Sequence, residues 1–302
     1  MRRPGVLWLA AVPVVATAVV YVLGPGESGG APAGPAVSAS PDAREAAKER
    51  AESERAKDDA LVASRPPGLA GPAKKELAQQ ILASAENSTL RWRETYGSIE
   101  DLGDGEGYTA GVVGFCTGTH DLLTLVERYT RKHPDNGLAA YLPALREVDG
   151  TDSHEGLDPG FTDAWRAESA KPAFRAAQEA ERDRVYFDPA VRMAKLDGLG
   201  TLGQFAYYDA MVLHGPDARP DGFYGLREKA LTRARTPDEG GDEKAFLTAF
   251  LDVRRAAMLA KRPDADTSRV DTAQRRFLRE GNLRLATPLT WAVYGETYRV
   301  PR

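Results

Sequence analysis

Apolar residues recur at helical spacing along most of the chain. Leu77, Ile81 and Leu82 fall on one face, which predicts a helix over residues 73–86. Similar spacing predicts further helices over residues 121–131, 173–185, 191–214, 225–235, 243–259 and 270–279. Residues 96–118 differ, because their glycines, an Asp-Gly step and a β-prone run are typical of short strands and turns. The pattern therefore indicates a mainly helical α+β unit with one small β element near its start.

The amino terminus has the pattern of an export segment. Met1-Arg2-Arg3 precedes a nearly continuous apolar run over residues 6–23. This run is long for a signal peptide and just long enough to cross a bilayer. Small residues at 31–33 and 37–39 are candidate cleavage sites. We interpret residues 1–23 as a signal peptide of a secreted protein, or alternatively as an N-terminal anchor on the outer face of the membrane.

The composition of residues 24–70 predicts a linker followed by a spacer. Residues 24–42 are rich in Gly, Pro, Ala and Ser, a composition typical of flexible linkers. Residues 43–60 combine helix formers and mixed charge but lack an apolar face, so they are either a solvated single helix or a disordered spacer. One compact domain is expected over residues 71–302.

Composition limits the classes of function. The net charge of −4 leaves no basic patch, so nucleic-acid binding is not expected. The single cysteine, Cys116, cannot form an intramolecular disulfide and is expected to be buried. His120, His133, His154 and His214 lack the spacing of metal ligands, so neither a metal nor another cofactor is expected.

Two carboxylates are candidates for chemistry. Glu86 ends the predicted helix over residues 73–86, and Asp104 lies in a glycine-rich turn 18 residues later. Many glycoside hydrolases place their acid and base on a helix end and a facing hairpin. The alternatives are a solvated helix-end glutamate and a turn aspartate that bonds its own backbone. Spacing alone does not decide between them.

Longer sequence words resemble a known family. They are Ser84–Ser88, Ile99–Gly105, Gly107–Thr109, Gly114–Thr119 with Asp121, Glu181–Ala190, Gly203–Ala210, His214–Pro216 and Thr267–Thr272. Across residues 71–302 the chain resembles the actinobacterial chitosanases of glycoside hydrolase family 46. The resemblance implies a lysozyme-like, two-lobed helical fold whose small sheet forms one wall of a substrate cleft. It also implies endo-hydrolysis of β-1,4 linkages between glucosamine residues, with inversion at the anomeric carbon.

The resemblance implies catalytic roles for three residues. Glu86 matches the general acid, which must be protonated when substrate binds. Asp104 matches the general base, which activates a water on the opposite face of the sugar. Thr109 matches the residue whose hydroxyl orients that water, although a threonine in a strand also has a purely conformational explanation.

Four further charged residues match supporting positions of the family. Asp121 matches a substrate-binding carboxylate that would recognise an ammonium group, and it also stands where a helix dipole favours an acid. Asp209, Arg254 and Arg269 match a buried charge network behind the acid. A purely structural ion-pair network is the alternative for these three.

Some positions of the pattern carry no catalytic expectation or depart from the family. Trp92, Trp165 and Trp291 match family positions that we interpret as structural. Glu106 stands where family members carry an arginine, and Ser98 where they carry a tyrosine. Both positions flank Asp104, and an extra carboxylate there would suit a cationic polymer or alter the subsites.

The resemblance implies a monomer that binds chitosan and glucosamine oligosaccharides, with membrane contact only through the possible anchor. A peptidoglycan hydrolase on the same scaffold would need a site for N-acetyl groups and lactyl-peptide branches, against which Asp121 argues. A non-catalytic carbohydrate-binding protein is the third reading. Retention of Glu86, Asp104 and Thr109 together argues against it.

Overall fold

The computed structural model describes residues 41–302, so the export segment 1–23 and the linker up to residue 40 lie outside the described residues. Two compact units divide the chain, Met1–Ala51 and Glu52–Arg302. The described part of the first unit belongs to helix α1 (Pro41–Ser64). The charged spacer is therefore helical, which is one of the two forms that its composition allows. No helix in the described part of the chain is long and apolar enough to cross a membrane.

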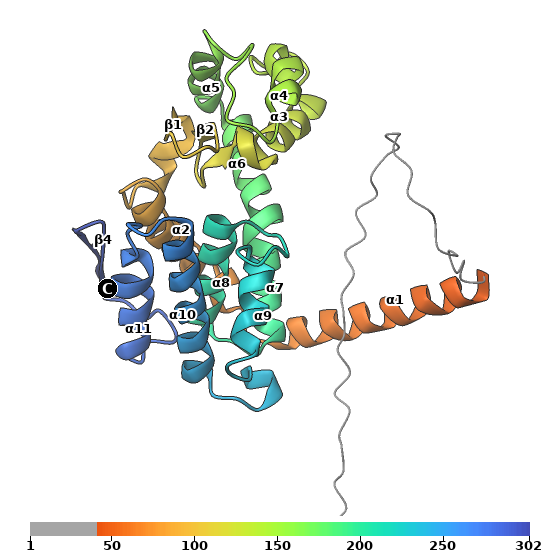
Figure 1. Ribbon diagram of the computed structural model, residues 1–302, viewed down its shortest axis with the longest axis vertical. Coiled ribbons are helices and arrows are strands. Elements are labelled where there is room, and N and C mark those ends of the chain that lie inside the picture. Colours follow the sequence, from red (N-terminus) through yellow and green to blue (C-terminus); the bar gives the residue numbers. More distant parts are fainter. Residues whose placement is uncertain (1–40) are drawn as a thin grey trace, which may run out of the picture. The chain divides into compact units, whose positions relative to one another are not determined.

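Helices dominate the second unit, as Figure 1 shows. Besides the rest of α1, its α-helices are α2 (Pro72–Glu86), α3 (Asp121–Lys132), α4 (Leu142–Val148), α5 (Phe161–Ser169), α6 (Pro172–Arg182), α7 (Asp188–Leu196), α8 (Thr201–His214), α9 (Phe223–Leu231), α10 (Glu243–Lys261) and α11 (Arg275–Arg279). Two π-helical segments, η5 (Asp183–Phe187) and η7 (Arg269–Gln274), lead directly into α7 and α11. The mainly helical class predicted from the sequence is confirmed.

Helix α8 forms the centre of this unit. All ten residues from Leu202 to Met211 are buried, which is typical of a helix surrounded by protein on every side. It packs against η1 (Gly68–Ala70), η5, α7, α9 and α10. Leu69 of η1 is fully buried, and its N–H donates to Oε1 of Gln204 at 2.7 Å. The core therefore begins just before the expected boundary at residue 71.

One helix prediction was wrong. The spacing predicts a continuous helix over residues 191–214, whereas α7 ends at Leu196 and α8 begins at Thr201. Gly198 has a φ of 75°, the left-handed conformation in which helices commonly end at a glycine. The adjacent Asp197 is buried and accepts hydrogen bonds from Tyr207 Oη at 2.6 Å and Arg227 Nε at 2.8 Å. These contacts hold the break in place and let α7 fold back against α8.

The predicted β element is a three-stranded antiparallel sheet. Its strands are β1 (Ile99–Asp101), β2 (Tyr108–Ala110) and β3 (Phe115–Cys116), with β2 in the middle. Figure 1 places β1 and β2 near α3, α4 and α5, at the opposite end of this unit from α9, α10 and α11. Gly107 ends the β1–β2 connection with a φ of 68°, and a Cβ there would lie 2.2 Å from Thr117 Oγ1. The close return of the connection therefore requires a glycine.

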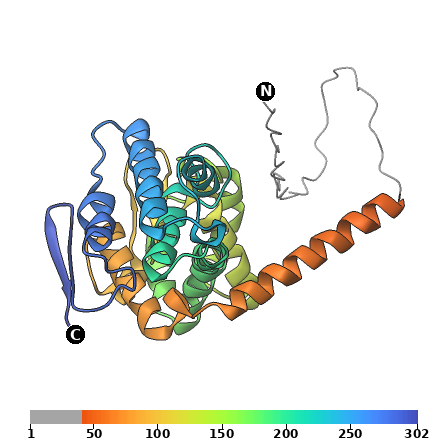
Figure 2. The same cartoon turned by 90° about the horizontal axis from the view of Figure 1, so that it is seen from below.

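A second β element was not predicted from the sequence. Strands β4 (Leu289–Val293) and β5 (Glu296–Val300) form an antiparallel hairpin, which Figure 2 shows in dark blue beside the C-terminus. The two turn residues, Tyr294 and Gly295, have φ values of 52° and 80°. Positive φ at both positions is the requirement of a type I′ turn, which usually selects Asn-Gly or Asp-Gly. A tyrosine at the first position hides this signal.

Candidate active site

Glu86 lies at the carboxyl end of α2, with its side chain 19% exposed. The predicted apolar face of α2 is buried, which fixes the helix against the core. Two residues before Glu86, the Ser84 hydroxyl accepts a hydrogen bond from Trp291 Nε1 on β4 at 2.9 Å. The C-terminal hairpin, missed in the sequence, therefore helps to hold the helix end that carries the candidate acid.

The structure brings together the predicted network behind Glu86. Nη2 of Arg269 donates both to Oε1 of Glu86, at 2.6 Å, and to Oδ1 of Asp209, at 2.8 Å. Nη2 of Arg254 donates to Oδ2 of Asp209, also at 2.8 Å. The four side chains come from α2, α8, α10 and η7, so the tertiary packing of these elements assembles the network.

Burial makes this network electrostatically strong. Asp209 is 1% exposed on the buried helix α8, where an unpaired carboxylate would be costly. Burial raises the pKa of Asp209, but the charges of Arg269 and Arg254 outweigh that effect and hold the pKa well below its usual range. Burial also lowers the pKa of Arg254, whereas Asp209 and Glu86 outweigh burial and raise the pKa of Arg269. Asp209 thus remains ionised and fixes Arg269 beside Glu86.

Gln274 completes this network and was missed in the sequence. Its Nε2 donates to Oδ2 of Asp209 at 2.7 Å, and its Oε1 accepts from Nη1 of Arg254 at 2.8 Å. Gln274 and Arg269 are the two ends of the π-helical segment η7. A π turn closes between residues five apart, whereas an α-helix rotates such residues by about 140°. Helical spacing alone therefore gave no signal that both would reach Asp209.

Asp104 and Thr109 lie on the β1–β2 hairpin. Asp104 is exposed in the connection, where its Oδ1 accepts the N–H of Glu106 at 3.1 Å. Thr109 is the middle residue of β2, and its hydroxyl lies 3.3 Å from Sγ of Cys116. Within the described residues no hydrogen bond joins either side chain to Glu86. The structure therefore places the candidate base and the candidate water-orienting residue on one hairpin, separate from the acid's network.

The hairpin is anchored by Tyr108, which adjoins Thr109. Its ring stacks on His154, with 3.9 Å between the ring centroids, and its hydroxyl donates to Oδ1 of Asp158 at 2.7 Å. His154 also lies close to Asp101 at the end of β1, with 3.3 Å between Nε2 and Oδ2. Contacts from one loop therefore hold both strands on either side of the connection that carries Asp104.

Asp121 is held by protein donors. It is 8% exposed at the start of α3, and its Oδ1 accepts from Cys116 N and Thr119 Oγ1, both at 2.8 Å. Its Oδ2 accepts from the hydroxyl of Tyr186, in η5, at 2.5 Å. Burial raises the pKa of Asp121 despite these bonds. The carboxylate therefore ties β3 and η5 to α3, and a bound ammonium group would share oxygens that the protein already uses. Its binding role stays a prediction.

The cysteine and the tryptophans lie in the core. Cys116 is buried as expected, and burial raises the pKa of its thiol to about 12. Trp92, Trp165 and Trp291 are buried, and each indole N–H donates to a protein acceptor, as structural tryptophans do. Among residues 41–302, no group of three or more His, Cys, Asp and Glu side chains could hold a metal ion.

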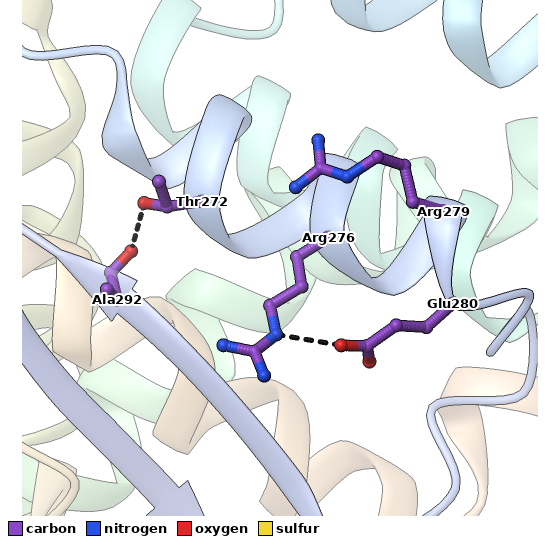
Figure 3. A pocket seen from close by; sticks show the side chains of 5 residues that line it. All are labelled: Thr272, Arg276, Arg279, Glu280 and Ala292. Carbon is purple, nitrogen blue, oxygen red and sulfur yellow. Dashed lines mark hydrogen bonds and ion pairs between the residues drawn. The ribbon is translucent and has the colours of Figure 1, made fainter.

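A pocket of about 390 Å³ lies between α11 and the C-terminal hairpin. Figure 3 shows the residues that line it, which are Thr272, Arg276, Arg279, Glu280 and Ala292. Arg276 bonds Glu280, and the Thr272 hydroxyl donates to the carbonyl oxygen of Ala292. None of the candidate site residues lines this pocket, so the candidate chemistry is not located there.

Comparison with known proteins identifies the family. The family model described as glycosyl hydrolase family 46 matches residues 80–289, a span that includes every candidate site residue. The chain belongs to glycosyl hydrolase family 46. It is therefore a glycoside hydrolase, and the resemblance noted in its sequence words is confirmed.

Relatives in family 46 are similar over most of the second unit. The chain is 56% identical to a chitosanase of Streptomyces sp. strain N174 over 231 residues, which cover 76% of this chain and 83% of that protein. A solved complex of chitosanase OU01 with substrate is 51% identical, with a TM-score of 0.77, and covers 78% of this chain and all of that one. A Gynuella sunshinyii family 46 chitosanase bound to chitotetraose is 32% identical, with a TM-score of 0.70, and the match covers 76% and 97% of the two chains.

Proposed function

We propose that this family 46 hydrolase cleaves internal β-1,4 linkages between glucosamine residues of chitosan by an inverting acid/base mechanism. The observation that carries the proposal is the attachment of Glu86, a helix-end carboxylate, to Arg269 and through it to the buried Asp209. The proposal is supported by the relatives, which are chitosanases, one of them solved with chitotetraose.

Glu86 is the proposed general acid. Because Nη2 of Arg269 donates to Oε1, a proton on Glu86 resides on Oε2, which accepts no hydrogen bond from the described residues. Oε2 gives this proton to the glycosidic oxygen as the bond between that oxygen and the anomeric carbon breaks. Arg269 keeps the carboxyl group in one orientation, and Asp209 balances the guanidinium charge.

Asp104 is the proposed general base. It removes a proton from a water that attacks the anomeric carbon from the opposite face, so the new C–O bond has inverted configuration. The Thr109 hydroxyl orients this water, and Asp121 contributes to binding of the glucosamine ammonium groups. After each turnover Glu86 is ionised and Asp104 protonated, and exchange with solvent restores both.

We also propose that the protein acts outside the cell, because chitosan is a polymer and residues 1–23 have the pattern of an export segment. The resemblance to the family supports the further proposal that it acts as a monomer. Cell fractionation followed by N-terminal sequencing separates the two forms. A soluble extracellular protein that lacks residues 1–23 supports secretion, whereas an intact membrane-bound chain supports the anchor. Retention in the cytoplasm would contradict both.

The decisive experiment follows the product anomer by proton NMR when the full chain is incubated with a glucosamine hexamer. Initial formation of the α-anomer supports inversion, because the β-linkage is then opened from the opposite face. Initial β-anomer would contradict the role of Asp104 as a base. Lack of cleavage would contradict the proposal that the enzyme hydrolyses chitosan.

Two variants assign the roles. Glu86→Gln and Asp104→Asn are expected to lower kcat by more than about 100-fold, within the range of a lost acid or base, while hexamer binding persists. Glu147→Gln makes the same charge change at an exposed position of α4 and serves as the matched control. Full activity of either site variant would remove that residue from the mechanism.

A further inference from the structure

An ion pair joins the β1–β2 hairpin to the end of α10. Nζ of Lys261, the last residue of α10, lies 2.9 Å from Oε1 of Glu106, although the two residues are 155 positions apart. Glu106 follows Asp104 by two residues, and its N–H is the donor to Oδ1 of Asp104. A primary ammonium group therefore rests on a carboxylate directly beside the proposed base.

The backbone of Glu106 is held firmly. Its carbonyl oxygen accepts the N–H of Gly118 at 2.9 Å, and a Cβ at Gly118 would lie 2.9 Å from the Cα of Glu106. Its Oε2 lies 3.7 Å from Sγ of Cys116, which is within reach of a weak hydrogen bond. The glutamate is thus fixed by its surroundings while its side chain remains 34% exposed.

Lys261 is held much less firmly. Its side chain is 67% exposed, and within the described residues its contact with Glu106 is its one hydrogen bond. Ion pairs this exposed contribute little to stability, so a cation from solution can replace the lysine at small cost. Arg219, a second cation whose charge interacts with Glu106, donates two hydrogen bonds to Oδ2 of its own partner, Asp217. It does not compete directly for the carboxylate of Glu106.

We propose that Glu106 is a specificity-determining residue that binds the ammonium group of a glucosamine unit beside Asp104, and that Lys261 is the counterion this unit displaces. The inference rests on the proposed function, because the ligand is the ammonium group of the proposed substrate. Lys261 carries the same primary ammonium group, so the ion pair shows that the carboxylate accepts this chemistry in this orientation. An N-acetylated unit is neutral and has no charge with which to displace the lysine.

The alternative is that the ion pair is a strap that holds the hairpin to α10. The two roles predict opposite changes in KM when Lys261 is replaced. Competition predicts that loss of Lys261 frees Glu106 and strengthens substrate binding, whereas a strap predicts that loss of either partner has the same effect.

The test measures KM and kcat on a glucosamine hexamer for the full chain and for Glu106→Gln, Lys261→Met and the double variant. Glu106→Gln is expected to raise KM by about tenfold, the effect of one lost charge-assisted hydrogen bond, with kcat within about twofold. Lys261→Met is expected to lower KM by about threefold, and to have no effect when Glu106→Gln is already present. Lys261 is exposed and Glu106 is half-buried, and thermal melting checks that the variants fold.

Matched controls separate local from long-range charge effects. Lys244→Met removes an exposed lysine from the other end of α10, and Glu147→Gln neutralises an exposed glutamate of α4. Neither control is expected to change KM by more than about 1.5-fold, because among the described residues neither side chain forms an ion pair with Glu106 and salt screens exposed charges. The rise in KM for Glu106→Gln is expected to be larger on fully deacetylated than on half-acetylated chitosan.

The outcomes distinguish the inference from the function on which it rests. A wild-type chain that cleaves the hexamer, with an unchanged KM for Glu106→Gln, overturns the inference and leaves the proposed function intact. Equal increases in KM for both single variants overturn it in favour of the strap. A wild-type chain that fails to cleave the hexamer overturns the proposed function and the inference together.

Discussion

Nη2 of Arg269 donates to Oε1 of Glu86 across 2.6 Å, although 183 positions separate the two residues in the chain. The same nitrogen donates to Asp209. One atom therefore couples the proposed acid to the most deeply buried carboxylate of the site. Substitutions at Asp209 or Arg269 are therefore expected to lower kcat by altering the orientation of the Glu86 carboxyl group.

Arg269→Lys tests this coupling. A lysine keeps the charge, but its ammonium group lacks the planar fork that Arg269 presents, so it cannot fix Glu86 and Asp209 with the same geometry. We expect kcat on the glucosamine hexamer to fall by about tenfold or more, with KM within about threefold. Arg276→Lys, at a partly exposed arginine of α11, is the control. A large rise in KM at unchanged kcat would contradict a positioning role.

Asp209→Asn is expected to destabilise the fold. The substitution leaves Arg254 and Arg269 buried without their carboxylate, and breaking a buried ion pair costs about 3–5 kcal/mol. Urea unfolding followed by circular dichroism at pH 7 measures the loss. Asp252→Asn, at a partly exposed acid of α10, is the control and is expected to cost less than about 1 kcal/mol. An equal stability of the two variants would contradict the strength assigned to the network.

Asp209 also predicts a dependence of stability on pH. Its pKa in the folded state is depressed below the ordinary 3.8, so the folded state binds the proton less tightly than the unfolded state does. The resulting stabilisation is complete above pH 3.8 and is lost as the pH falls below that value, by about 1.4 kcal/mol per pH unit. The difference in unfolding free energy between wild type and Asp209→Asn is therefore expected to shrink between pH 4 and pH 3. A difference that stays constant would contradict the depressed pKa.

A double-mutant cycle tests the contact between Trp291 and Ser84. Trp291→Phe leaves the Ser84 hydroxyl without the indole donor, and Ser84→Ala leaves the buried indole N–H without an acceptor. We expect each variant to lose about 1–3 kcal/mol of unfolding free energy, with a coupling of about 1 kcal/mol. Strictly additive losses would show that the hairpin does not hold the end of α2 through this bond.

Cys116 is expected to be unreactive in the folded protein. Burial raises the pKa of its thiol to about 12, so almost no thiolate exists at pH 8, and the thiolate is the reactive form. A chromogenic disulfide reagent should therefore detect no thiol in the native chain and one thiol per chain in guanidinium. Rapid reaction of the native protein would contradict its burial.

Local sequence patterns predicted those parts of the fold that depend on local periodicity. Helices α2 and α3 follow from their apolar spacing, and the glycine-rich run gives the small sheet. Periodicity missed the break at Gly198, because a single left-handed glycine stops a helix without changing the apolar pattern around it. It also missed the β4–β5 hairpin, whose turn begins with an atypical tyrosine.

The candidate site depended on the resemblance to the family. No local pattern connects Glu86 with Arg269, because their contact is created by the packing of α2 against distant elements. Gln274 escaped notice because π-helical geometry, and not α-helical spacing, brings it to Asp209. The bond from Tyr186 to Asp121 spans 65 positions and likewise depends on tertiary structure. The proposed role of Glu106 in specificity rests on its contact with Lys261, a contact between distant positions that the sequence does not predict.

The two π-helical segments make the register of the chain as important as its residue types. Each carries a donor to a buried carboxylate, Tyr186 to Asp121 and Gln274 to Asp209. Deletion of one residue inside either segment would replace the wide π turn by a regular α turn, in which residues five apart differ in direction by about 140°, and would move the donor away from its carboxylate. Family members that preserve these contacts must therefore keep both segments free of single-residue gaps, even where they tolerate substitutions and where their surface loops differ in length.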